Sequence, residues 1–201
     1  MLYMELKITK SEQGGFSILE LLIVMIITLA VMVAASTLLA SSLRTRTREN
    51  SRSDALAAAQ RALNIMSREI INSGYGLNDN GIVVADSAVD SIRVRANLNN
   101  DTDLNDVDED VRFILQTANG EVVRYDNSTP AGARSVLSTN ITSLTIKYLN
   151  VAGTQVSCDN AERVSIEVLV NLPAGPEQPA SQVYLVSQVA LRNAPGTLQQ
   201  F

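Results

Sequence analysis

Histidine and tryptophan are absent from this 201-residue chain, and cysteine occurs only once, as Cys158. Without histidine, the most frequent general base of enzymes and the commonest metal ligand are both missing. A single cysteine excludes an intramolecular disulfide, so we expect Cys158 to be a buried free thiol. Aromatic residues make up only 4% of the chain, which argues against a surface that stacks nucleic-acid bases.

Positive charge is also scarce, because 16 lysines and arginines stand against 21 acidic residues, for a net charge of −5. A domain that binds nucleic acid normally presents a basic face, so we predict no nucleic-acid partner for the soluble part. The chain also lacks the G-x-S-x-G motif of hydrolases and a phosphate-binding Walker loop. We therefore expect a binding or structural protein and not an enzyme.

The longest feature that is present is an uncharged, mainly apolar run from Leu21 to Leu43. A helix of about 20 apolar residues crosses a bilayer. A buried core helix is the alternative, but such a helix is rarely apolar on every face. A secretory signal peptide carries its small-residue cleavage site after the apolar run, whereas Gly14 and Gly15 precede it here. We predict a membrane-spanning helix that stays on the processed chain.

The segment Gly15-Phe16-Ser17-Ile18-Leu19-Glu20 resembles the class III signal sequence of type IV pilins and of the pseudopilins of type II secretion. That family pattern is a short polar leader with lysine, then glycine, phenylalanine, a glutamate at the fifth mature position, and a long apolar run. The resemblance implies that a prepilin peptidase cuts after Gly15 and methylates the new amine of Phe16. It also implies that Glu20 pairs with the N-terminal amine of a neighbouring subunit during assembly.

The resemblance implies an α+β pilin fold, in which a long N-terminal helix packs on an antiparallel β-sheet head. The helix has a transmembrane half and an amphipathic half. The expected parts are a cleaved leader over 1–15, a transmembrane and assembly helix over 16–43, an amphipathic helix over 44–74, and a β-rich head over 75–201.

Apolar residues in the amphipathic half recur at alternating spacings of three and four, which places them on one helical face. They are Leu56, Ala59, Leu63, Met66 and Ile70. We expect this face to pack against the head, and we expect Gly74 to follow the end of the helix as its C′ residue.

Alternating polar and apolar residues predict antiparallel strands in the head, with one face covered by the helix. The expected strands are 91–96, 111–115, 121–125, 144–148, 164–170 and 183–191. Asn119-Gly120 predicts a hairpin between the second and third of them. Pro173–Pro176 is expected to form a loop before the last strand.

Weaker motifs resemble the W-type minor pilins and the J-type minor pseudopilins. They are Arg61-Ala62-Leu63, Arg68-Glu69-Ile70, Gly74-Tyr75-Gly76, Ile141-Thr142-Ser143-Leu144 with Tyr148, and Val189-Ala190-Leu191-Arg192-Asn193. Many major pilins have a C-terminal disulfide, which one cysteine cannot supply. The resemblance thus implies a minor type IV pilin, at the tip or in initiation of a pilus. A minor pseudopilin of type II secretion and a membrane-anchored ligand-binding or adhesion module are the alternatives.

The implied location is the bacterial inner membrane, with one span, a cytoplasmic N-terminus and a periplasmic or extracellular head, and later the pilus or pseudopilus. The implied partners are prepilin peptidase, other pilins or pseudopilins, the inner-membrane assembly platform, and membrane lipid before assembly. The count of lysine and arginine favours the opposite orientation, because the cluster of Arg44, Arg46, Arg48 and Arg52 follows the span. We follow the motif, since peptidase processing needs the leader on the cytoplasmic side.

Acidic residues are concentrated between Asn99 and Asp110. Asp101, Asp103 and Asn105 match the first three ligands of an EF-hand loop, but the glycine and the final glutamate of that loop are replaced by Asp106 and Arg112. This is therefore not an EF-hand. Two interpretations remain open, a solvated acidic loop and a looser Ca²⁺ site. The ligands of the looser site would be Asp101, Asp103, Asn105, Asp108 and Asp110.

Overall fold

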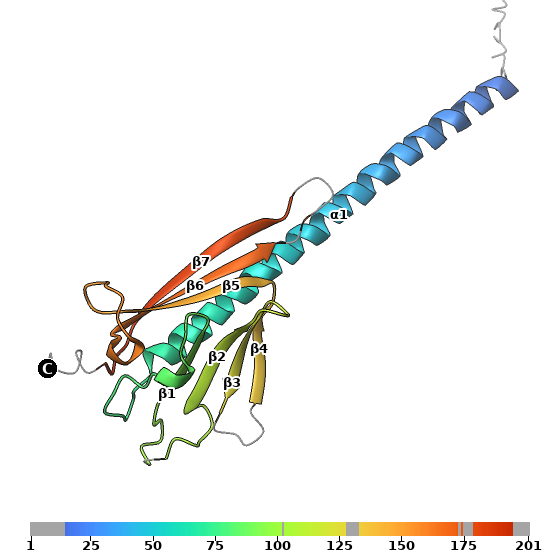
Figure 1. Cartoon of the computed structure of the whole chain (residues 1–201). Helices are drawn as coiled ribbons and strands as arrows, with labels where there is room; N and C mark the ends of the chain where they lie inside the picture. Colours follow the sequence, from blue (N-terminus) through green and yellow to red (C-terminus); the bar gives the residue numbers. More distant parts are fainter. Residues whose placement is uncertain (1–14, 102, 128–132, 173, 175–178, 195–201) are drawn as a thin grey trace, which may run out of the picture. The chain divides into compact units, whose positions relative to one another are not determined.

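The computed structural model describes residues 15–101, 103–127, 133–172, 174 and 179–194. It confirms the α+β class, since one long N-terminal helix is followed by antiparallel β-structure (Figure 1). The elements are α1 (Ile18–Ile71), β1 (Ser91–Arg95), β2 (Asp110–Gln116), β3 (Glu121–Asp126), β4 (Ala133–Ser138), β5 (Ile141–Leu149), β6 (Arg163–Leu172), β7 (Ser181–Ala190) and two short 3₁₀ helices, Val84–Asp86 and Cys158–Asn160. The chain divides into two compact units, Met1–Thr47 and Arg48–Phe201.

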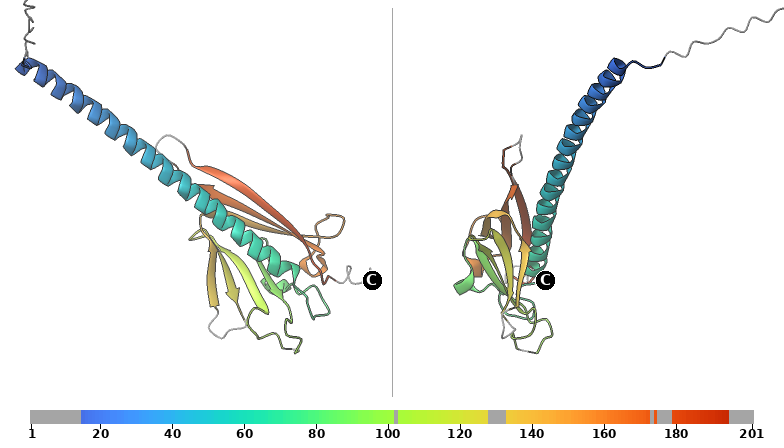
Figure 2. Two further views of the ribbon diagram at one scale, coloured as in Figure 1. Left: turned by 180° about the vertical axis from the view of Figure 1, so that it is seen from behind. Right: turned by 90° about the vertical axis from the view of Figure 1, so that its right-hand side faces the viewer.

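The part of α1 in the second unit packs along one face, as the spacing of its apolar residues predicts. Its buried residues are Ala55, Ala59, Ala62, Leu63, Met66 and Ile70. Leu56, at the edge of this face, is half-buried. Figure 2 shows this part of α1 lying against the strands of the second unit.

The turn after α1 contains Gly74, but this residue does not cap the helix as predicted. Gly74 has a positive φ of 74°, and its N–H donates to the carbonyl of Arg95 in β1 at 2.8 Å. Gly81 also has a positive φ, and a Cβ atom there would lie 2.1 Å from the nitrogen of Gly74. Only glycine fits such a contact. The two glycines thus hold the turn after α1 against β1.

The strands form two antiparallel sheets, with the orders β1-β2-β3-β4 and β5-β6-β7. The predicted strands are confirmed, but neither their division into two sheets nor β4 was predicted. β4 has the sequence ARSVLS, and its first four residues are exposed, so it lacks a marked apolar alternation. The β2–β3 hairpin is also confirmed. Its loop has four residues, because Gln116 pairs with Glu121.

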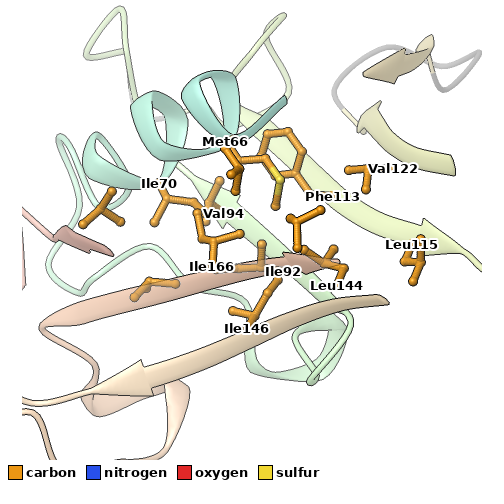
Figure 3. Close-up of a cluster of buried hydrophobic side chains, with 14 of the residues drawn as sticks. Met66, Ile70, Ile92, Val94, Phe113, Leu115, Val122, Leu144, Ile146 and Ile166 are labelled. Carbon is orange, nitrogen blue, oxygen red and sulfur yellow. The ribbon is translucent and has the colours of Figure 1, made fainter. Parts of the chain in front are cut away.

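The core lies between α1 and both sheets (Figure 3). Met66 and Ile70 of α1 point towards Phe113 and Val94 of the first sheet, and all four side chains are at most 4% exposed. The cluster continues to residues of the second sheet, which include Leu144, Ile146 and Ile166. Cys158 is a buried free cysteine, as predicted. The predicted loop Pro173–Pro176 falls mostly outside the described residues.

Candidate functional site

The predicted cleavage site lies in a segment without helix or strand. Gly15 and Phe16 precede α1, and the Phe16 side chain is 82% exposed. A Cβ atom built on Gly15 would meet nothing within 4 Å. No described residue therefore covers the Gly15–Phe16 peptide bond, so an enzyme can approach it. Cleavage and methylation stay predictions.

Ser17 explains why α1 begins where it does. Its Oγ accepts a hydrogen bond from the N–H of Leu19 at 3.3 Å, and its carbonyl accepts one from the N–H of Leu21 at 3.2 Å. These are the contacts of an N-cap residue. Glu20 stands three residues after Ser17, which is the spacing of a capping box, but the bond from the Ser17 N–H to its carboxylate is not formed among the described residues. An acid in the first helical turn also stabilises a helix, typically by about 0.3–1 kcal/mol. The sequence contained this signal, and the interpretation of Glu20 as an assembly residue overlooked it.

Among the described residues of its own unit, the first half of α1 has no apolar partner. Every large apolar side chain from Ile18 to Leu43 is at least 49% exposed. The helix is long and apolar enough to cross a membrane, and none of its most apolar stretch is buried. An apolar surface of this size is normally covered by lipid or by another protein. This supports a single-pass membrane anchor.

Four of the five hydroxyl groups within this apolar stretch are satisfied inside the helix. Each donates to a backbone carbonyl three or four residues earlier, at 2.7–2.9 Å. They are Thr28, Ser36, Thr37 and Ser41. Such bonds let a hydroxyl enter an apolar medium without an unsatisfied donor.

Glu20 differs from these hydroxyl residues. Among the described residues, its carboxylate forms no hydrogen bond and no ion pair. It shares an apolar surface hollow with Phe16, Leu21, Val24 and Met25. The apolar part of the Glu20 side chain therefore borders the same hollow as the residue that would carry the N-terminal amine after cleavage.

Of the five predicted calcium ligands, Asp101, Asp103 and Asn105 are joined by hydrogen bonds within the loop, whereas Asp108 and Asp110 pair with arginines. Asp101 lies near Asp106 and Glu109, and each of the three offers a carboxylate oxygen within 4.8 Å of the others. Asp103 instead accepts hydrogen bonds from the backbone and the side chain of Asn105. Asp106 and Glu109 were not among the predicted ligands.

Asp110 is paired with arginines of β1. Its carboxylate accepts two hydrogen bonds from Arg93, at 2.6 and 2.7 Å, and one from Arg95 at 2.9 Å. Burial by itself would raise the pKa of Asp110. The hydrogen bonds from Arg93, Arg95 and Asn127 outweigh burial, so the pKa lies below its usual range. The charge of Asp110 is thus compensated by the protein itself.

Asp108 is also paired with an arginine. Arg124 of β3 bridges Asp108 and Glu69, and its Nε lies 3.0 Å from the Glu69 carboxylate. Burial raises the pKa of Glu69 and outweighs the opposite effect of Arg124. These contacts join α1 to the first sheet, so Asp108 has a structural role whether or not the loop binds calcium.

No protein-family model and no curated protein matches the chain. The features that bear on its function are the N-terminal segment, the exposed apolar helix and the charged residues of the head.

Proposed function

We propose that this protein is a subunit of a type IV pilin-like filament, held in the membrane by α1 until it assembles. The observation that carries the proposal is Glu20. It is a carboxylate without a partner among the described residues, on an exposed apolar helix, and it closely follows a glycine-phenylalanine pair that lies outside the helix.

The physical reason for this arrangement is the energy of an acid in hydrocarbon. Acidic side chains within membrane-spanning segments are rare because burial in hydrocarbon is costly, and such residues usually mark a function. Cleavage after Gly15 would create an amine on Phe16. The amine of a neighbouring subunit can then neutralise Glu20, while the apolar side chains of adjacent helices pack on one another and replace lipid.

The layout of the second unit supports a pilin fold. The amphipathic part of α1 supplies six buried residues to the core of an antiparallel β domain, so it serves as the spine of the head. The single cysteine favours a minor subunit, which would act at the tip or in initiation of a type IV pilus. A minor pseudopilin of a type II secretion system would use the same N-terminal device.

The proposal places the N-terminus in the cytoplasm and the head in the periplasm or outside the cell. Prepilin peptidase would process the chain at the inner membrane, and the assembly platform would then join it to other pilins or pseudopilins. The head needs no catalytic group for this role.

Replacement of Glu20 by glutamine tests the proposal, with Glu49→Gln as the matched control on the exposed surface of the same helix. We expect both variants to be cut after Gly15 and methylated on Phe16, as measured by mass spectrometry of the N-terminus. The amount of Glu20→Gln protein in sheared filaments should fall at least about tenfold, which corresponds to about 1.4 kcal/mol. Glu49→Gln should assemble like the wild type.

Two results would contradict the proposal. Normal assembly of the Glu20→Gln variant would remove the role of the carboxylate. A wild-type chain that keeps its leader and never enters sheared filaments would instead favour a membrane-anchored ligand-binding or adhesion module.

A further inference from the structure

The loop between β1 and β2 contains an acidic group that filament assembly does not use (Figure 1). Asp101 and Asp106 are exposed, whereas Glu109 is only 1% exposed. Carboxylate oxygens of the three residues lie within 4.8 Å of one another. Negative charges at this separation repel each other, and the repulsion is strongest where water is excluded.

Glu109 provides an independent observation. Its Oε1 accepts hydrogen bonds from the N–H groups of Leu98, at 2.6 Å, and Asn99, at 3.3 Å. Its Oε2 is also buried, but it has no hydrogen-bond partner among the described residues. No lysine or arginine in the described part of the chain forms an ion pair with Glu109. A buried carboxylate without a counter-charge is costly, so the site calls for a cation.

The neighbouring acidic residues differ from Glu109 in their partners or their exposure. Asp108 and Asp110 are within two residues of Glu109, and each is paired with arginine. Asp103 is exposed and bonded within the loop to Asn105. Only the group of Asp101, Asp106 and Glu109 combines closeness with an unpartnered buried oxygen.

We propose that Asp101, Asp106 and Glu109 form a binding site for Ca²⁺. Calcium takes six to eight oxygen ligands at about 2.3–2.6 Å, so two of its ligands are at most about 5 Å apart. The spacing within the group meets this limit. Three carboxylates supply up to six oxygens, and water molecules can complete the coordination.

In this structure the side chain of Asn99 lies between Asp101 and Asp106. Its Nδ2 donates to Asp101 at 2.8 Å and to Asp106 at 2.6 Å. The amide thus bridges the two carboxylates and partly offsets their repulsion. Since Glu109 directly precedes β2, the ion would fasten the loop to the sheet.

Calorimetric titration tests this site in the full chain, purified in detergent and stripped with a chelator. CaCl₂ should bind the wild type at one site. Asp106→Asn and Glu109→Gln should each weaken binding at least tenfold, because each removes a charged ligand. Asp103→Asn is the matched control, since it removes the same charge from the same loop, and it should stay within threefold of the wild type.

Asp106 is exposed, so its variant should fold normally even if Glu109→Gln does not, and circular dichroism checks this. The absence of Ca²⁺ binding by the wild type would overturn the proposal. A loss of affinity in Asp103→Asn as large as in Asp106→Asn would also overturn it, because the loop would then use a different ligand set. Neither result bears on the role of Glu20 in assembly.

Discussion

Single polar residues hold parts of the head together from buried positions. Asn80 is 1% exposed, and its Nδ2 donates to the carbonyls of Cys158, Asp159 and Ala161 at 2.8–3.1 Å. Its Oδ1 accepts the N–H of Ile82. A buried amide is tolerated when its hydrogen bonds are made, as they are here. Asn80 therefore connects the turn after α1 to the segment before β6.

Asp110 allows a test at the same scale. Its side chain is 7% exposed and neutralises both Arg93 and Arg95. Asp110→Asn leaves Arg95 without an ion-pair partner among the described residues, and it leaves Arg93 paired only with Asp86. Removing one partner of a fully buried pair costs about 3–5 kcal/mol. Because the arginines retain some contact with water, we expect the free energy of unfolding to fall by about 2–3 kcal/mol at pH 7, as measured by urea denaturation.

The pH dependence of this loss of stability can also be predicted. The pKa of Asp110 is lower in the folded protein than its unfolded value of about 4. Its contribution to stability is therefore complete above pH 4 and is lost as the pH falls through the folded value. The difference between wild type and Asp110→Asn should shrink below pH 4. A difference that stays constant down to pH 2 would contradict the role of the charge.

At the scale of elements, α1 contributes one face of six buried residues to the second unit. Leu63 is 2% exposed and lies in the main hydrophobic cluster. We expect Leu63→Ala to lower the free energy of unfolding by about 2–5 kcal/mol, because it removes buried methyl groups and leaves a cavity. Thermal and urea denaturation in detergent measure the loss.

Gln60 provides the control, since it is exposed on the same helix three residues earlier. Gln60→Ala removes no buried atom and keeps a good helix former, so the free energy of unfolding should change by less than about 0.5 kcal/mol. Equal effects of the two substitutions would mean that this face of α1 does not pack as described.

The same elements show how far sequence reasoning reaches. The helical stripe and most strands follow from periodicity, because burial of one face imposes a regular apolar spacing. β4 escaped prediction since its exposed side chains leave no such pattern. The pairing of Asp110 with Arg93 was equally hidden, because it depends on the register of β1 against β2 and not on any local motif. The acidic residues of the loop could be seen in the sequence. Which of them pair with arginines, and which lie together without an arginine, could not.

At the scale of the whole molecule, the boundary between the two units has a consequence for folding. Every residue of the hydrophobic cluster lies in Arg48–Phe201, and the first of them is Ala55. No described residue of the first unit belongs to this cluster. A fragment of residues 48–201 therefore keeps the core of the head and sheds the surface that requires lipid or a partner.

We expect this fragment to be soluble without detergent and to unfold in one cooperative transition, as followed by circular dichroism and calorimetry. A fragment of residues 72–201 is the control, and it lacks the six buried residues of α1. Burial of Leu63, Met66 and Ile70 contributes about 1.5–3 kcal/mol each, or roughly 5–9 kcal/mol together. Small domains have a total stability of only about 5–15 kcal/mol, so the shorter fragment should not fold stably. Cooperative unfolding of residues 72–201 would show that the sheets do not depend on α1. Failure of 48–201 to fold in water would place part of the stability of the head in the membrane-spanning segment.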